Sequence, residues 1–224
     1  MKRFLYLIVA VAVSFICNET MASSMDDKLE QLGFVNVKSV DADIVVDLMY
    51  ASANNFVGKT MYETLTGAYL HPDAAVALKK AQQALKTLHP DLTLKVFDAA
   101  RPMSVQRTMY NVVRGTSKAR YVSNPANGGG LHNYGLAVDI TIVDNHGQEL
   151  DMGTHVDYLG KESNIDKENE LVSAGRISRQ AQLNRQLLRK VMAKGGWKPL
   201  KSEWWHFNIC TRAQARIKYR ILDF

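Results

Sequence analysis

Residues 128–142 read GGGLHNYGLAVDITI and join a glycine-rich loop to an apolar run. Apolar side chains alternate through the second half of this stretch, at Leu136, Val138, Ile140 and Ile142. This alternation predicts a central β-strand. His132 follows the glycines, and Asp139 lies inside the predicted strand. A carboxylate in a buried strand is costly unless it is paired or bound to a metal. The stretch therefore predicts a sheet that carries a metal-competent histidine and aspartate, with an outward-facing Asp139 as the alternative.

The second informative stretch is Glu203-Trp204-Trp205-His206, near the C-terminus. Together with His132 and Asp139 it supplies two histidines and one aspartate, a ligand set typical of a catalytic zinc that leaves one coordination position open for water. Glu203 is well placed to take a proton from that water. Residues three apart share one face of a helix but lie on roughly opposite faces of a regular strand. The tryptophans favour a strand, so the convergence of Glu203 and His206 would need a bulge or a strand end.

Further elements follow from periodicity and from turn residues. Strands are predicted near 43–48, 92–96, 136–142 and 203–209, and helices over 72–88, after Pro102 and over 178–194. The inward faces of the last two helices are predicted to carry Val105, Met109 and Val112, and Leu183, Leu187 and Val191. Helices and strands mix without a regular βαβ alternation. The fold class is therefore predicted as α+β, a single domain with a mainly antiparallel sheet flanked by helices.

The N-terminus differs from the rest of the chain. Lys2 and Arg3 precede an apolar run over 4–17, and a small-residue site ends at Ala22. This layout is typical of a secretory signal peptide, and the run is short for a membrane span. We expect residues 1–22 to be removed and residues 23–224 to form the mature domain, exported to the periplasm or secreted, without stable membrane insertion. A retained membrane anchor is the alternative.

Composition and charge exclude several classes of protein. An apolar share of 46% with five prolines describes an ordinary globular chain. After removal of residues 1–22 only Cys210 remains, so the mature chain forms no internal disulfide. The formal charge falls only from +6 to +5, and its lysines and arginines form no basic stripe. Nucleic-acid binding therefore finds no support, although a mild positive charge could favour approach to anionic cell-envelope polymers. No pattern indicates an oligomeric state.

The two informative stretches also carry a family resemblance. The pattern His-x-x-Gly-x-Ala-x-Asp occurs as His132, Gly135, Ala137 and Asp139, and Glu-x-Trp-His occurs as Glu203, Trp205 and His206. Both resemble the zinc D-alanyl-D-alanine peptidases, a fold shared with hedgehog signalling domains. Segments 47–58 (DLMYASANNFVG), 98–102 (DAARP) and 151–157 (DMGTHVD) make the chain more similar to the D-alanyl-D-alanine dipeptidases of the vancomycin-resistance type. The ordered set spans nearly the whole predicted mature chain.

The resemblance implies a role for each matching residue. His132, Asp139 and His206 would hold one zinc ion per chain, and Glu203 would be the general base. Arg101 would stabilise the oxyanion, with a structural ion pair to Asp98 as the alternative. Tyr50 and Asp157 match positions near the substrate, where Asp157 would receive the free ammonium group. The alternative for Asp157 is capping of a turn.

The implied activity is hydrolysis of the small peptide D-Ala-D-Ala, in cell-wall metabolism or glycopeptide resistance. One departure concerns recognition of this substrate, because the family usually has serine two residues before the first histidine, where this chain has Gly130. A zinc D,D- or L,D-carboxypeptidase acting on peptidoglycan stem peptides is the first alternative, and segments 50–58 and 151–157 argue against it. A non-catalytic zinc module that binds cell-wall peptide is the second. Glu203 and Arg101 argue against that module, because binding alone needs neither.

Overall fold

The computed structural model describes residues 23–224, so the predicted signal peptide lies outside the described residues. The main sheet consists, in spatial order, of β2 (Val45–Val46), β4 (Thr93–Asp98), β5 (Ala137–Val143), β7 (Glu203–Asn208) and β6 (Lys198–Leu200). Strand β2 runs parallel to β4, and all other neighbours are antiparallel. The predicted α+β class with a mainly antiparallel sheet is confirmed.

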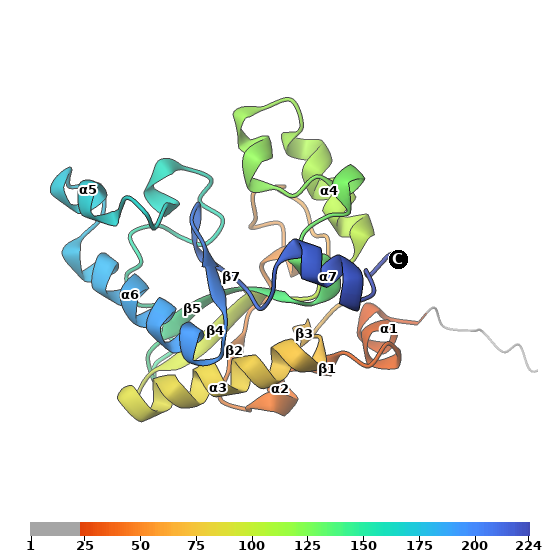
Figure 1. The fold of residues 1–224 in the computed structure, drawn as a ribbon, viewed down its shortest axis with the longest axis horizontal. Coiled ribbons are helices and arrows are strands. Elements are labelled where there is room, and N and C mark those ends of the chain that lie inside the picture. Colours follow the sequence, from red (N-terminus) through yellow and green to blue (C-terminus); the bar gives the residue numbers. More distant parts are fainter. Residues whose placement is uncertain (1–22) are drawn as a thin grey trace, which may run out of the picture.

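Helices flank this sheet on two sides, as Figure 1 shows. The three long ones are α3 (Pro72–Leu88), α4 (Met103–Val113) and α6 (Arg179–Lys194). The short ones are α1 (Met25–Gln31), α2 (Val37–Val40), α5 (Glu168–Ser173) and α7 (Arg212–Lys218). A small second sheet pairs β1 (Val35–Asn36) with β3 (Tyr69–Leu70). Helices α3 and α6 contact each other, whereas α4 lies on the other side of the sheet in Figure 1.

Two of the long helices, α3 and α6, begin where the sequence supplies a side-chain cap. Pro72 is the first residue of α3, where a backbone N–H would have no partner within the helix, so the missing N–H of proline loses no hydrogen bond. The ring of His71 accepts a hydrogen bond from the backbone amide of Asp73 at 3.2 Å. Ser178 caps α6 through a 2.8 Å hydrogen bond from the Ala181 amide. Both helices therefore start within one residue of the predicted position.

The inward faces of α4 and α6 agree with the prediction only in part, because Val105, Met109 and Val191 are buried but two other residues are exposed. Val112 and Leu183 are 48% and 43% exposed, whereas Val113, next to Val112, and Gln182 and Asn184, on either side of Leu183, are buried. In α6 the buried face also includes Arg185, which is fully buried. A search for apolar residues alone misses part of the buried face of α6, because it assigns an arginine to the solvent side.

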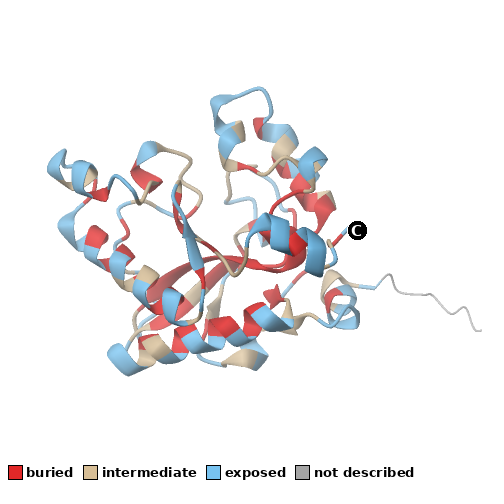
Figure 2. Ribbon diagram, in the orientation of Figure 1, coloured by how far each residue is buried: buried red, intermediate tan, exposed pale blue. Residues whose placement is uncertain are grey.

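Strand β5 crosses the centre of the core. All seven of its residues are buried, and Figure 2 shows the strand in red, the colour of buried residues. Asp139 is only 4% exposed, so the alternative of an outward-facing carboxylate is wrong. A buried carboxylate needs a positive partner or a metal, and β5 thus brings a costly group into the middle of the sheet.

Among residues 23–224 no helix is both long enough and apolar enough to cross a lipid bilayer.

Candidate active site

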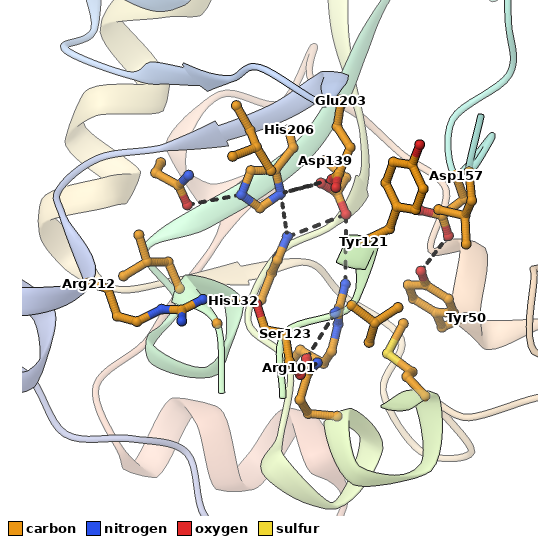
Figure 3. A pocket seen from close by; sticks show the side chains of 18 of the residues that line it. Tyr50, Arg101, Tyr121, Ser123, His132, Asp139, Asp157, Glu203, His206 and Arg212 are labelled. Carbon is orange, nitrogen blue, oxygen red and sulfur yellow. Dashed lines mark hydrogen bonds and ion pairs between the residues drawn. The ribbon is translucent and has the colours of Figure 1, made fainter. Parts of the chain in front are cut away.

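Three side chains from two strands and one turn converge at the centre of the sheet. Asp139 comes from β5 and His206 from β7, while His132 lies in the short 3-10 helix η4 (Leu131–Tyr134). One ligand atom from each lies within 4.8 Å of the other two. The inward nitrogens are His132 Nε2 and His206 Nδ1, which lie 3.2 Å apart, and Asp139 carboxylate oxygens lie 3.3 and 2.9 Å from them (Figure 3). We call these three side chains the acceptor cluster.

The outer ring nitrogens fix the tautomers of both histidines. His132 Nδ1 lies 2.7 Å from the Ala99 carbonyl oxygen, and His206 Nε2 lies 3.0 Å from Asn208 Oδ1. Both partners accept hydrogen bonds, so the outer nitrogens carry the protons and the inner nitrogens present lone pairs. Two lone pairs and a carboxylate therefore face one point, and only a cation or a shared proton satisfies them together. The cluster therefore suits a metal ion, and hydrogen bonds on the far side of each histidine ring orient the ligand nitrogens toward it.

The electrostatics of the cluster favour positive charge as well. Burial alone would lower the pKa of His132, yet the neighbouring Asp139 raises it. Burial also disfavours the charged form of Asp139, but His132 and His206 hold the pKa of this carboxyl well below its usual range. Asp139 is therefore a full carboxylate at neutral pH, suited to bind a divalent ion.

Pairing of the strands explains why Glu203 joins this cluster. Asp139 stands opposite His206 in the antiparallel pair of β5 and β7. The pairing of β6 with β7 shifts register between Pro199 and Leu200, so that Leu200 faces Glu203. This irregularity reconciles the three-residue spacing with a strand, since Glu203 Oε2 lies 4.0 Å from His206 Nδ1. Burial raises the pKa of Glu203 to about 8, against the opposing effect of His206.

Arg101 lies at the corner between β4 and α4, and its pair with Asp98 is present. Its Nε donates to Asp98 Oδ2 at 2.8 Å, and its Nη1 donates to Gln106 Oε1 at 3.0 Å. Its Nη2 also bonds Asp98 and faces the cluster, 3.7 Å from Asp139 Oδ2. Burial alone would lower the pKa of Arg101, but Asp98, together with the other acidic groups around it, raises this pKa above its ordinary value and keeps the guanidinium charged. The ion pair thus orients a permanent cation toward the cluster.

Tyr50 and Asp157 form a hydrogen-bonded pair of side chains. The Tyr50 hydroxyl donates to Asp157 Oδ2, and this is the only hydrogen bond that the carboxylate receives from residues 23–224. The absence of a backbone donor argues against the turn-capping alternative. Asp157 adopts φ 62°, a left-handed conformation that is uncommon outside glycine. Burial raises the pKa of Asp157 to about 6, and Asp139 adds to the rise.

Side chains from distant elements hold the loop that carries Asp157, residues 151–160, and sequence reasoning missed them. Arg185 of α6 donates from Nε to the Met152 carbonyl at 2.7 Å and from Nη2 to the Glu162 carbonyl at 3.0 Å. Asn184 donates to the Asp151 carbonyl at 2.7 Å, and Trp204 Nε1 donates to Thr154 Oγ1 at 2.8 Å. The available signal was that polar residues fall on the inward face of the 178–194 helix.

Gly130, where the sequence departs from the family pattern, lies against Ser123. A Cβ at position 130 would meet Ser123 Oγ at 2.8 Å. The backbone of Gly130 is extended, with φ −111°, so a side chain is conformationally allowed there but would displace the Ser123 hydroxyl. A hydroxyl thus occupies this place after all, from a different segment of the chain.

The candidate metal-binding, catalytic and substrate-binding side chains line one cavity of about 300 Å³. Tyr50, Arg101, Asp157, Glu203 and the acceptor cluster are among its lining residues. This volume is at the small end of the range for ligand sites. Two histidines outside the site, His89 and His146, are exposed. The cavity therefore suits a small polar ligand beside a metal.

Comparisons with known proteins agree with this geometry. The model of a peptidase family, M15, described as D-ala-D-ala dipeptidase, matches residues 30–224. The chain is similar to a D-alanyl-D-alanine dipeptidase of Escherichia coli (strain K12), with 32% identity over 78% of this chain and 83% of the relative. A D-alanyl-D-alanine dipeptidase of Synechocystis is 26% identical, over 84% of this chain and 85% of its own length. One from Enterococcus faecalis is 25% identical, over 79% and 91%.

Proposed function

Because the chain belongs to the D-ala-D-ala dipeptidase family of M15 peptidases, we propose that it hydrolyses the dipeptide D-alanyl-D-alanine to two molecules of D-alanine. Membership makes the chain a metallopeptidase, and so a hydrolase with a small peptide as substrate. The observation that carries the proposal is the acceptor cluster, with Glu203 beside it in a cavity of small volume.

Zinc is the metal that we propose for the acceptor cluster, one ion per chain. His132, Asp139 and His206 would hold it, since imidazole and carboxylate together suit this ion. When bound, zinc would polarise the peptide carbonyl and lower the pKa of water in its open coordination position.

Glu203 acts as the general base in this proposal. Its carboxylate takes a proton from the water that attacks the peptide carbonyl, and it then delivers the proton to the leaving amine. A group that both takes and gives a proton works best when its pKa lies near the working pH. Burial moves Glu203 in that direction, with a pKa of about 8.

Arg101 stabilises the negative charge that develops on the carbonyl oxygen. Its guanidinium is held by Asp98 and Gln106, so it needs no reorganisation when that charge appears. Asp157, oriented by Tyr50, receives the free ammonium group of the substrate. A charge-assisted hydrogen bond of this kind selects peptides with a free N-terminus.

We also propose that hydrolysis takes place outside the cytoplasm, after removal of residues 1–22. The support is the cationic start and apolar run at the N-terminus. Cell-wall peptide metabolism and glycopeptide resistance both provide D-Ala-D-Ala as a substrate.

A side-by-side comparison of three substrates tests the proposal. The mature protein is incubated with D-Ala-D-Ala, with its N-acetyl form, and with a wall pentapeptide that ends in D-Ala-D-Ala, and the products are identified by mass spectrometry. We expect kcat/KM to be about 10-fold or more higher for the free dipeptide, because an acylated amine leaves the Asp157 carboxylate unpaired. Equal or faster cleavage of the pentapeptide would instead favour a carboxypeptidase.

A further inference from the structure

Acidic and basic side chains lie at opposite sides of the cavity. Figure 3 shows Asp157 and Tyr50 on one side of His132 and Arg212 on the other, with Ser123 below. Arg212 and Ser123 both line the same cavity as the acceptor cluster. The proposed function uses the anionic side, where Asp157 lies, but gives no role to the cationic side.

Arg212 is a cation without a charged partner. It is the first residue of α7, its side chain is exposed, and its one hydrogen bond within residues 23–224 goes from Nη2 to Ser123 Oγ at 3.2 Å. No carboxylate of the described chain lies within ion-pair distance of it. The other arginine that lines the cavity, Arg101, is already paired with Asp98. Arg212 is therefore the guanidinium that remains available for an anionic ligand.

Ser123 is held in place next to this guanidinium. The Gln106 side-chain amide donates to the Ser123 carbonyl at 2.8 Å, and the same Gln106 accepts from Arg101 at 3.0 Å. Gly130 leaves the space that the Ser123 hydroxyl occupies. The hydroxyl can donate to an anion while the guanidinium supplies two further donors, an arrangement that suits a carboxylate.

We propose that Arg212 and Ser123 bind the free C-terminal carboxylate of the substrate. This inference rests on the proposed function, because a dipeptide is a zwitterion with its ammonium and carboxylate at opposite ends. Asp157 receives the first and the Arg212–Ser123 pair receives the second, so the peptide bond lies between them, over the acceptor cluster. The two ends together make the free acid of a dipeptide the preferred substrate.

A cross of enzyme variants with substrates tests this assignment. The kcat/KM values are measured for D-Ala-D-Ala and for its C-terminal amide, with the zinc-loaded parent, Arg212→Gln, Arg212→Lys and Ser123→Ala. The parent prefers the acid by about 10- to 100-fold, the range expected for a hydrogen bond to a charged group. Arg212→Gln loses this preference because hydrolysis of the acid slows while that of the amide is unchanged. Arg212→Lys and Ser123→Ala retain part of it.

Lys218→Gln is the matched control. Lys218 lies on the same helix, its side chain makes no hydrogen bond or ion pair with residues 23–224, and it does not line the cavity, so this change removes the same charge without touching the site. It keeps the parental preference for the acid. Calorimetric binding of the acid and the amide to the Glu203→Gln background, with and without Arg212→Gln, gives a second readout, in which only binding of the acid weakens.

The outcomes separate this inference from the proposed function. If the parent hydrolyses D-Ala-D-Ala but Arg212→Gln keeps the full acid preference, or slows acid and amide equally, the carboxylate site is wrong and the proposed function stands. If the parent does not hydrolyse D-Ala-D-Ala, the proposed function fails, and the inference fails with it.

Discussion

The acceptor cluster and the Asp157 loop (residues 151–160) are held by different kinds of interaction. Asp139 and His206 face each other across β5 and β7, so the backbone ladder sets their separation. The Asp157 loop belongs to no strand, and individual side chains of α6 and β7 hold it instead. Many backbone hydrogen bonds between the strands fix the positions of Asp139 and His206, whereas a few side-chain hydrogen bonds fix the position of the loop. Metal binding and substrate binding should therefore be separable by mutation.

The largest expected effect concerns Glu203, which lines the same cavity as the acceptor cluster and Asp157. Glu203→Gln removes the base but keeps the shape of the side chain, so kcat should fall by about 10²–10⁴-fold. Zinc content, measured by elemental analysis, should stay at the parental level, because a base is not needed to hold the ion. A variant that hydrolyses D-Ala-D-Ala at the parental rate would remove Glu203 from the mechanism.

Arg101 tests whether an ion pair that holds structure also serves catalysis. Arg101→Lys keeps the charge but loses the planar fork that bonds Asp98 and Gln106 at once. We expect kcat/KM to fall by about 10²-fold, the effect typical of one lost donor to an oxyanion. Thermal unfolding serves as the control for folding. Normal kinetics in a folded variant would reduce Arg101 to a partner of Asp98.

The smallest expected effect concerns the loop alone. Arg185→Met removes the hydrogen bonds to the Met152 and Glu162 carbonyls, so the Asp157 loop should loosen and KM should rise by about 10-fold. Zinc content and kcat should change little. Arg189→Met is the matched control, because Arg189 lies one turn further along α6 and bonds Glu168 but not the loop. Equal effects of the two variants on KM would contradict a specific role for Arg185.

Sequence reasoning reached the strand-borne part of the site more fully than the loop-borne part. The alternation around Asp139 predicted β5, and the two motifs singled out the residues of the acceptor cluster. The convergence of Glu203 with His206 stayed open, because it depends on the register shift between β6 and β7, and register is set by pairing rather than by local composition.

The loop-borne part depends on contacts between distant segments. A pattern of apolar residues predicts that Arg185 faces solvent, although its side chain is buried. Only the packed structure shows the carbonyl oxygens to which it donates hydrogen bonds. Likewise, Gly130 stands where the family usually has serine, so the sequence alone indicated that a hydroxyl is missing from the site. The fold supplies one from Ser123, seven residues away in the sequence.

The most direct test of the central claim is a zinc titration of metal-free protein, with hydrolysis of D-Ala-D-Ala as the readout. The acceptor cluster predicts no activity without metal and a linear rise that ends near one zinc per chain, since three protein ligands leave one position open for chemistry. Full activity in protein that elemental analysis confirms to be metal-free would contradict the account.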